Sequence, residues 1–392
     1  MSEWTTQRLE KIIQVNPTVK LTKGKVYPFI DIDKVSPTLR SVTNEEVKTY
    51  DGQSCSKFCN GDTVFSRITP CLENRKIAKV SINGQAAFGS TEFYIFRAKE
   101  GKSDENFVYY LTSSDAVVLP AINSMTGASG RQRADKRFIE RTKLNVPELP
   151  TQKRIADILS TYDDLIENNN RRIALLEKAA QELYKEWFVR FRFPGHEMAA
   201  FENGLPKGWV TKKLFDIANV KYGYAFKSDL FCEDETLNPV VRIRDIPNNK
   251  TNTFTSEECD EKYIINENAI VIGMDGIFHM CLWNGGKAFL NQRVVEIESK
   301  IEDLSNLYLY YALHPQVKYW EQTISGTTVA HLGDKHLKKM TVIMPNEEIA
   351  QKATAIFNEI MIQKNILFKQ NQNLIKQRDL LLPRLMSGKL EV

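Results

Sequence analysis

Two long stretches of the chain carry apolar residues at heptad spacing, and each stretch predicts one long helix. In the first, the apolar positions alternate in steps of four and three, which is typical of a coiled-coil seam. Its expected seam residues are Ile155, Leu159, Tyr162, Ile166, Asn169, Ile173, Leu176, Ala180, Leu183 and Trp187. The second seam is more mixed and comprises Ala353, Phe357, Ile360, Lys364, Leu367, Asn371, Leu374, Arg378, Leu381 and Leu385. Since helices of this length span on the order of 50 Å at about 1.5 Å per residue, we expect them to act as spacers.

One asparagine interrupts the seam near the middle of each predicted helix. A buried asparagine at a seam position fixes the alignment of two helices at a cost in stability. Asn169 and Asn371 are therefore candidates for setting the register of the two helices. The alternative, that one or both face solvent, has equal weight at this point.

The strand-like segments before each helix are similar in the two halves, which predicts an internal repeat. Four matches keep their order along the chain: 4–9 with 209–214, 27–33 with 238–244, 87–93 with 288–294, and 107–111 with 307–311. In the strongest match, Thr-Gly-x-Ser at 126–129 and Asp-Lys at 135–136 correspond to Ser-Gly-x-Thr at 325–328 and Asp-Lys at 334–335. The sequence predicts an α+β protein in which two globular domains form a pseudo-twofold tandem repeat, separated by two long helices that form an antiparallel coiled coil.

Glycine and proline residues near positions 194–195 and 204–208 mark the break between the halves, because they cannot continue a helix. The expected division is a first domain at 1–150, a spacer helix at 151–192 and a linker at 193–208. A second domain at 209–345 and a second helix with the C-terminal tail at 346–392 complete it.

Composition narrows the class of protein. The chain has 392 residues, of which 42% are hydrophobic and 26% charged, which is enough for two or three domains. Apolar runs are too short to cross a membrane and the first residues lack the apolar core of a signal peptide, so we expect a cytoplasmic protein. Six cysteines without a Cys-x-x-Cys pair favour reduced thiols over disulfides or a structural metal.

A net charge of +4 does not identify a partner, but positive charge gathers between positions 131 and 154. Only three carboxylates lie in this stretch, against eight basic residues. The basic residues are Arg131, Arg133, Lys136, Arg137, Arg141, Lys143, Lys153 and Arg154. Such a stretch suits a surface that faces phosphates, and by itself it would equally suit a solvated basic face.

Several motifs together resemble those of a known family. They are GLPKGW at 204–209, the repeated Gly-x-Ser/Thr and Asp-Lys segments, VPELPTQKRIADIL at 146–159, and LLPRLMSGKL at 381–390. With these motifs the chain resembles the specificity subunits of bacterial and archaeal type I restriction-modification systems over nearly its full length. It departs from the family pattern in the second repeat, where PNEEIAQ at 345–351 replaces the fuller motif and the helix seam is less apolar.

The resemblance implies two target recognition domains, each reading one half of a split site on double-stranded DNA. It also implies that the helices dock two methyltransferase subunits, and that restriction subunits with an ATP-driven motor and a nuclease join this core. The methylated base in such systems is usually adenine. S-adenosylmethionine, ATP and Mg are then expected in the partner subunits, with no cofactor in this chain and no membrane contact.

Catalytic motifs are missing from the sequence. The Asn-Pro pairs at 16–17 and 238–239 lack the second proline of a methyltransferase loop, and Gly101-Lys102-Ser103 lacks the upstream glycine of a phosphate loop. The acidic group at 31–33 aligns with arginines in the other half. A metal site built from His331, Asp334 and His336 is a weaker interpretation than DNA contact or a surface role. We therefore expect a non-catalytic subunit.

Residues able to contact DNA are present in both domains, since arginine suits guanine, asparagine and glutamine suit adenine, and lysine, serine and threonine suit phosphate. In the first domain the candidates are Arg67, Arg75, Lys76, Asn123, Ser129, Arg131, Gln132, Arg133 and Lys136. In the second they are Arg242, Arg244, Lys287, Asn291, Gln292, Arg293, Thr327, Thr328, His331 and Lys335. Because the two sets differ, we expect an asymmetric site with unequal halves, separated by a spacer whose length the helices set.

Three other functions remain as alternatives. A free-standing DNA-binding regulator would bind DNA tightly without a partner. A fused restriction-methylation enzyme would need the motifs that are missing. A structural coiled-coil adaptor would leave the paired globular domains without a purpose.

Overall fold

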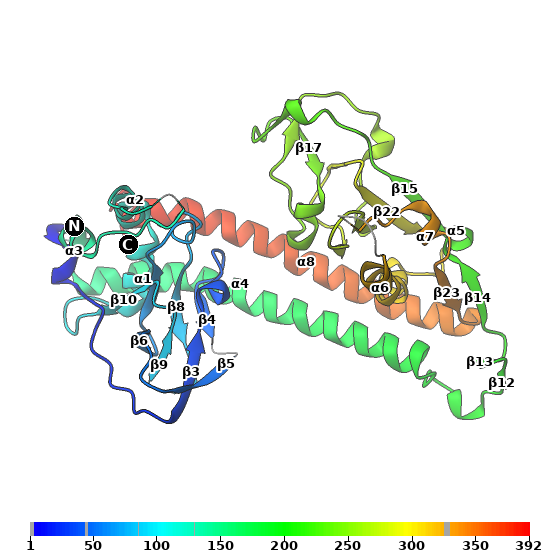
Figure 1. The fold of residues 1–392 in the computed structure, drawn as a ribbon, viewed down its shortest axis with the longest axis horizontal. Helices are drawn as coiled ribbons and strands as arrows, with labels where there is room; N and C mark the ends of the chain where they lie inside the picture. The colour runs from blue at the N-terminus through cyan, green and yellow to red at the C-terminus, as the bar shows by residue number, and fades with distance from the viewer. Residues whose placement is uncertain (1–3, 44–45, 85, 129, 325–329) are drawn as a thin grey trace. The chain divides into compact units, whose positions relative to one another are not determined.

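The computed structural model describes residues 4–43, 46–84, 86–128, 130–324 and 330–392. Strands and short helices alternate in each half, and one long helix follows them: α4 (Leu149–Tyr184) and α8 (Glu347–Met386) (Figure 1). The chain divides into two compact units. The first contains the described residues up to Asn170 together with Lys369–Val392, and the second contains Arg171–Phe368. Each long helix therefore contributes to both units.

Two sheets form the domain of the first unit. The larger has the order β2 (Ile13–Val15), β10 (Phe93–Ala98), β7 (Thr63–Ser66), β8 (Ile77–Ser81), β4 (Ser41–Thr43). The other has the order β5 (Glu46–Tyr50), β3 (Lys25–Ile30), β9 (Ala86–Gly89), β6 (Ser56–Cys59), and β1 (Trp4–Arg8) pairs separately with β11 (Lys143–Pro147). Successive side chains of β10 point to opposite faces, so Tyr94 and Phe96 enter one apolar core while Phe93 and Ile95 enter another.

The domain of the second unit repeats this plan. Its main sheet has the order β15 (Ala218–Tyr222), β22 (Val294–Ser299), β19 (Ile270–Gly273), β20 (Met280–Leu282). A second sheet contains β16 (Phe231–Cys232), β18 (Phe254–Thr255), β17 (Asn238–Val241) and β21 (Phe289–Leu290), and β14 (Val210–Lys213) pairs with β23 (Thr341–Met344). Strand β22 alternates as β10 does: Val295 and Ile297 enter the core that also contains parts of α4 and α8, whereas Val294 enters a separate core.

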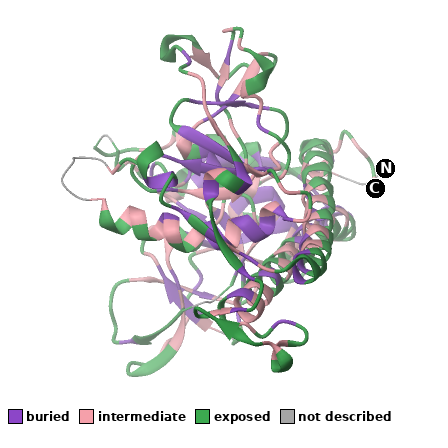
Figure 2. Cartoon of the chain, turned by 90° about the vertical axis from the view of Figure 1, so that its right-hand side faces the viewer, coloured by how far each residue is buried: buried purple, intermediate pink, exposed green. Residues whose placement is uncertain are grey.

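Short helices complete each domain. The first has α1 (Glu105–Ser113), α2 (Asp115–Asn123) and α3 (Lys136–Arg141); the second has α5 (Leu214–Ile217), α6 (Asn306–Thr323) and α7 (Asp334–Leu337). A small hairpin, β12 (Phe201–Glu202) with β13 (Leu205–Pro206), lies between α4 and β14. Figure 2 shows buried positions gathered on the strands and exposed positions along much of the long helices.

Two of the sequence matches between the halves are wrong by one residue. Asp104 and Ser305 are the N-caps of α1 and α6, and both accept backbone hydrogen bonds, so Tyr110 corresponds to Tyr311 and the 107–111 match shifts by one. In the other match, Asp135 caps α3, whereas Gly333 caps α7 and Asp334 already lies inside that helix. The sequence match paired the two identical Asp-Lys segments. The residues that cap the two helices are an aspartate and a glycine, so they gave no match in sequence.

The long helices run antiparallel within each unit. In the first unit, Asp163 and Asn169 of α4 contact Arg378 and Asn371 of α8 respectively, so the residue numbers rise on one helix as they fall on the other. The same holds in the second unit, where Glu177 of α4 forms an ion pair with Lys364 at 2.6 Å. After Tyr184 the chain continues as one π-helical turn, Lys185–Val189.

All of the expected seam positions lie at least partly inside the protein. Those that are buried are Ile155, Leu159, Ile166, Asn169, Ala180, Ala353, Phe357, Leu367, Asn371 and Leu385. Those that are partly buried are Tyr162, Ile173, Leu176, Leu183, Trp187, Ile360, Lys364, Leu374, Arg378 and Leu381. Many of them also pack against a domain core, which a seam between two helices alone would not require.

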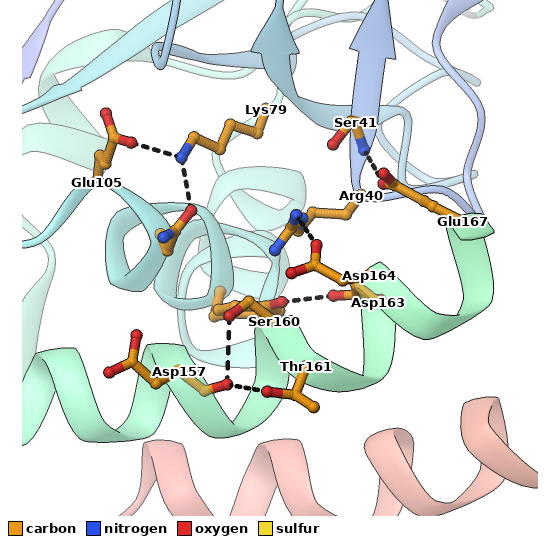
Figure 3. Close-up of polar contacts among 12 residues, drawn as sticks. Arg40, Ser41, Lys79, Glu105, Asp157, Ser160, Thr161, Asp163, Asp164 and Glu167 are labelled. Carbon is orange, nitrogen blue, oxygen red and sulfur yellow. Dashed lines mark hydrogen bonds and ion pairs between the residues drawn. The ribbon is translucent and has the colours of Figure 1, made fainter.

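Polar contacts join the first domain to α4 (Figure 3). Arg40, which immediately precedes β4, forms an ion pair with Asp164. The backbone N–H of Ser41 donates to Oε1 of Glu167 at 3.2 Å. These two contacts hold the edge of the larger sheet against one face of α4.

A buried charge pair joins the same domain to both helices. The carboxylate of Asp163 accepts hydrogen bonds from the hydroxyl of Tyr110 on α1 and, at 2.6 Å, from Nη1 of Arg378 on α8. The side chains of Asp163 and Arg378 are 3% and 16% exposed. Because neither charge is well hydrated, each depends on the other for compensation.

The two seam asparagines are both 6% exposed, and they contact each other. Nδ2 of Asn169 donates to Oδ1 of Asn371 at 2.9 Å, and Nδ2 of Asn371 donates to Oδ1 of Asn170 at 2.8 Å. Such a chain of amides needs one axial alignment of the helices, because a shifted helix would bury unpaired amide groups.

Replacing Asn169 with leucine is expected to lower the free energy of unfolding of the first unit by about 1–3 kcal/mol, since the amide of Asn371 loses a partner while staying buried. Native-state hydrogen exchange of the helix peptides measures the change. Asn168→Leu, at an exposed neighbouring position, should change it little. If the loss is due to the unpaired amide, the double variant Asn169→Leu with Asn371→Leu should regain most of the stability.

Candidate nucleic-acid interface

Three backbone hydrogen bonds build a small frame at one edge of the first domain. The N–H of Arg67 donates to the carbonyl of Glu92 at 2.9 Å, and the N–H of Ala134 donates to the carbonyl of Arg67 at 2.8 Å. The N–H of Thr69 donates to the carbonyl of Gln132 at 3.0 Å. Segments distant in sequence thus come together where β7 and β10 meet the chain that leads into α3.

The second domain contains the same frame. The N–H of Met274 donates to the carbonyl of Arg293 at 2.9 Å, and the N–H of Leu332 donates to the carbonyl of Met274 at 2.8 Å. The N–H of Gly276 donates to the carbonyl of Ala330 at 3.0 Å. This one-to-one agreement places His331 where the first domain has Arg133, Arg293 where it has Glu92, and Asp275 where it has Ile68.

In the first domain the frame presents two arginines around one carboxylate. Arg133 donates two hydrogen bonds to Glu92, from Nε to Oε2 at 2.9 Å and from Nη2 to Oε1 at 2.6 Å. Arg67 donates from Nε to Oε2 of Glu92 at 3.3 Å, and its guanidinium lies over the ring of Tyr94. The hydrogen bonds from Arg133 hold the pKa of Glu92 below its usual value, so this carboxylate is ionised at neutral pH.

In the second domain the carboxylate occupies a different position of the frame. Nδ1 of His331 lies 2.6 Å from Oδ1 of Asp275, and Nε of Arg293 lies 3.4 Å from Oδ2. Both basic side chains are about half exposed, whereas Asp275 is 27% exposed. The same backbone therefore carries a transposed set of charges.

The frame brings together only some of the first-domain candidates. Arg67, Gln132 and Arg133 belong to it, and Arg131 is an exposed neighbour. The remaining candidates lie elsewhere: Asn123 is exposed at the end of α2, Lys136 forms an ion pair with Glu140 at 3.4 Å, Arg75 contacts Asp115 and the carbonyl of Ser113, and Lys76 donates to the carbonyl of Ile32 at 3.0 Å. Ser129 lies outside the described residues.

A similar division applies to the second domain. Arg293 and His331 belong to the frame, with Gln292 exposed beside it and Lys335 exposed on α7. The other candidates lie apart: Asn291 is buried, Arg242 stacks on Phe231, Arg244 donates to Thr253 at 3.0 Å, and Lys287 lies 3.9 Å from Glu261. Thr327 and Thr328 are outside the described part of the chain.

Sequence reasoning missed the carboxylates of the frame. Glu92 and Asp275 have no cation beside them in the sequence, since Arg133 follows Glu92 by 41 residues and His331 follows Asp275 by 56. The one available signal was the match between 87–93 and 288–294, which sets Glu92 against Arg293. The charge at this position is reversed between the domains, and in each domain a nearby side chain of opposite charge compensates it.

The histidine and aspartate residues of the suggested metal cluster are engaged separately. His331 contacts Asp275, while Asp334 accepts hydrogen bonds from Tyr222 and contacts Lys338. His336 is buried, and its Nδ1 accepts a hydrogen bond from the N–H of Gly333 at 3.0 Å. Within the described residues, no three His, Cys, Asp or Glu side chains gather in a way that could hold a metal ion. None of the described helices is long and apolar enough to span a membrane.

Acidification is expected to destabilise the second unit through His336. Burial, together with nearby Lys335, His331 and Lys339, lowers its pKa from the usual 6.5. The folded state therefore favours the neutral ring: the stability is fully present above the unfolded pKa of about 6.5 and is lost as pH falls from there through the lower folded pKa. The melting temperature should drop between about pH 7.5 and pH 5.5.

The variant His336→Asn isolates this contribution, because an amide oxygen can still accept from Gly333 but does not titrate. The burial of His314 also lowers its pKa, so both proteins keep that part of the pH dependence. Equal slopes of melting temperature against pH in the two proteins would contradict the assignment to His336.

The repeated frame and the antiparallel helix segments show that the two halves of the chain share one architecture. Sequence comparison identifies the family to which this architecture belongs. The family model for the type I restriction modification DNA specificity domain matches residues 1–178 and 206–377. The chain belongs to this family. Its two matched ranges correspond to the two repeats, each with most of its long helix.

Curated members of the specificity family resemble the chain at moderate identity. The type I restriction enzyme MjaIX specificity subunit of Methanocaldococcus jannaschii is 25% identical over 427 residues, covering 100% of this chain and 94% of that protein. The EcoBI specificity subunit of Escherichia coli is 29% identical over 186 residues, covering 46% of this chain and 39% of that protein. The first similarity extends over both repeats.

A solved structure of the specificity family has the same fold. The type I restriction-modification S subunit from M. genitalium superposes with a TM-score of 0.57 at 15% sequence identity, covering 98% of this chain and 96% of that one. The expected α+β architecture with two tandem domains and long helices is thereby confirmed.

Proposed function

We propose that this chain is the DNA-reading subunit of a type I restriction-modification complex, in which each domain recognises one half of an asymmetric bipartite site. One observation carries the proposal: two domains share a backbone frame but present different charged groups on it. A shared frame supports a shared task, and different side chains support unequal half-sites. The recognition domains are taken as 1–150 and 209–345, with helices at 151–192 and 346–392 joined to them and a linker at 193–208.

The helices are proposed to dock methyltransferase subunits. Large apolar side chains remain exposed along them, although the chain has domain cores in which such residues could be buried. In the first unit these are Leu165 and Leu380, at 46% and 62% exposure. In the second they are Leu175, Ile356, Ile362 and Ile366, each at 40–60% exposure. Exposed apolar residues on a helix support a protein partner.

Catalysis is assigned to the partners. The basic side chains of both frames pair with carboxylates, an arrangement that supports DNA recognition. The sequence also lacks the loops that bind S-adenosylmethionine or nucleotide. The complex would bring S-adenosylmethionine on the methyltransferase subunits, and ATP with Mg on restriction subunits. This chain would direct the complex to its recognition site on double-stranded DNA.

The test is to co-express the chain with the methyltransferase subunit of its system and to map methylated adenines by single-molecule sequencing. A split, asymmetric motif is the expected result. The double variant Arg293→Ala with His331→Ala should lose or relax the second half of that motif while the first half remains. A palindromic motif would overturn the unequal half-sites, and tight DNA binding by the chain alone without any methylation would favour a free-standing regulator.

A further inference from the structure

The two hydrogen bonds from Arg133 to Glu92 leave one edge of the guanidinium free. Nε and one hydrogen of Nη2 are used by the carboxylate. Among the described residues, Nη1 has no hydrogen-bond partner, so the edge formed by Nη1 and Nη2 keeps parallel N–H donors. Arg133 is 46% exposed while Glu92 is 20% exposed, which places the arginine on the solvent side of the pair.

We propose that Arg133 reads a guanine in the first half-site and that Glu92 is the positioning residue that presents it. O6 and N7 of guanine form a pair of acceptors in the major groove, and two parallel donors of a guanidinium match them. A phosphate contact would not need a fixed orientation, whereas a base contact does, because the acceptors of the neighbouring base pairs differ. This inference rests on the proposed function.

Arg67 strengthens the arrangement from the other side. Its Nε donates to the same Oε2 that accepts from Nε of Arg133, and its guanidinium stacks near Tyr94. Glu92 therefore has a second anchor that does not depend on Arg133. Since the carboxylate stays in place while Arg133 contacts DNA, the reading side chain does not have to be ordered again at each encounter.

At the matching position of the second domain, the frame presents a different group. Nδ1 of His331 lies 2.6 Å from Oδ1 of Asp275, so Nε2 is the ring nitrogen that the carboxylate does not engage. A single ring nitrogen does not match the two acceptors of guanine as the paired donors of a guanidinium do. We therefore expect the structurally equivalent position in the second half-site to require a base other than guanine.

Methylation mapping with the complex of this chain and its methyltransferase subunit tests the inference. Arg133→Lys keeps the charge but loses the paired donors, so one guanine of the first half-site should become tolerant of other bases, with discrimination reduced about tenfold to a hundredfold. The second half-site should be unchanged. Arg8→Lys, on β1 of the same domain, is the matched control. Arg8 is 53% exposed and lies outside both the frame and the DNA-contact candidates, so this variant should leave the motif intact.

Glu92→Gln tests the positioning role separately, and it keeps the size of the side chain. It should relax the same guanine and no other position, with the melting temperature recorded to show that the domain is folded. For the second domain, His331→Leu should relax one position of the second half-site only. An unchanged motif for Arg133→Lys, a uniform loss at all positions, or a wild-type first half-site without guanine would overturn the inference. A wild-type complex that methylates no split motif would instead overturn the proposed function itself, and the inference with it.

Discussion

Replacing Arg378 with alanine is expected to lower the free energy of unfolding of the first unit by about 3–5 kcal/mol, the largest effect of any exchange considered for that unit. The reason is the carboxylate of Asp163, which is 3% exposed and would lose its compensating charge while staying buried. Among the described residues, the hydroxyl of Tyr110 would remain its single strong donor. Native-state hydrogen exchange of peptides from α1 and from the first half of α4 measures the loss where it occurs.

Arg384→Ala on the same helix is the control for lost helical arginine, because Arg384 is exposed, and it should change stability by less than about 0.5 kcal/mol. A second variant separates charge from packing. Asp163→Asn combined with Arg378→Met removes both charges at similar volume, so it should regain most of the stability that Arg378→Ala loses. Equal losses in Arg378→Ala and in this double variant would show that packing, not charge, accounts for the effect.

Replacing Phe188 with alanine is expected to destabilise the second unit by about 3–5 kcal/mol. Phe188 is 2% exposed and packs edge-on against Tyr308, with ring centroids 4.6 Å apart, and against Trp209 at 5.7 Å. Its removal would leave a cavity between the end of α4 and the domain core. Urea unfolding followed by tryptophan fluorescence suits this test, because Trp4 is the one tryptophan that lies outside the second unit.

Val189→Ala is the matched control for Phe188→Ala. Val189 is the next residue and is 59% exposed, so its truncation should shift the unfolding midpoint little. If the two variants unfold at the same urea concentration, the aromatic cluster around Phe188 does not stabilise the second unit as its burial indicates.

The helices and the repeat could be predicted from the sequence because both depend on regular spacing. Apolar residues every three or four positions predicted α4 and α8, and matched segments predicted two domains of one fold. The burial of Asn169 and Asn371 at the seam was one of two open possibilities, since spacing alone does not show which way a seam residue points. The structure shows the two amides in contact.

The frame could not be predicted, because its contacts join residues that are distant in the chain. Neither the bond between Glu92 and Arg133 nor the one between Asp275 and His331 has a local signature. Alignment by identical letters also failed at α7, where glycine takes the capping position that Asp135 takes in α3. Candidate residues chosen by type alone therefore included several, such as Lys76 and Asn291, that the fold uses internally.

The two domains attach to the helices through different chemistry, although Tyr110 and Tyr311 occupy equivalent positions. The hydroxyl of Tyr110 donates to a buried carboxylate, whereas that of Tyr311 donates to the backbone carbonyl of Glu177 at 3.0 Å. The first attachment depends on side chains of both helices, but the second depends in part on backbone that any sequence would supply. Exchanging the helix residue that meets the tyrosine hydroxyl should thus disturb the contact of Tyr110 more than that of Tyr311.

The buried pair of Asp163 and Arg378 also has a mechanical consequence. If α8 slid along α4 by one turn, about 5.4 Å, Leu374 or Leu382 would face Asp163 in place of the arginine. An apolar seam offers little resistance to such a step, because one leucine replaces another, but a buried charge cannot be moved past leucine without losing its partner. Under a load along the helix axis, the pair of Asp163 and Arg378 would resist sliding of α8 along α4 until the helices separate. Up to that point the two helix segments would move together as one rigid body.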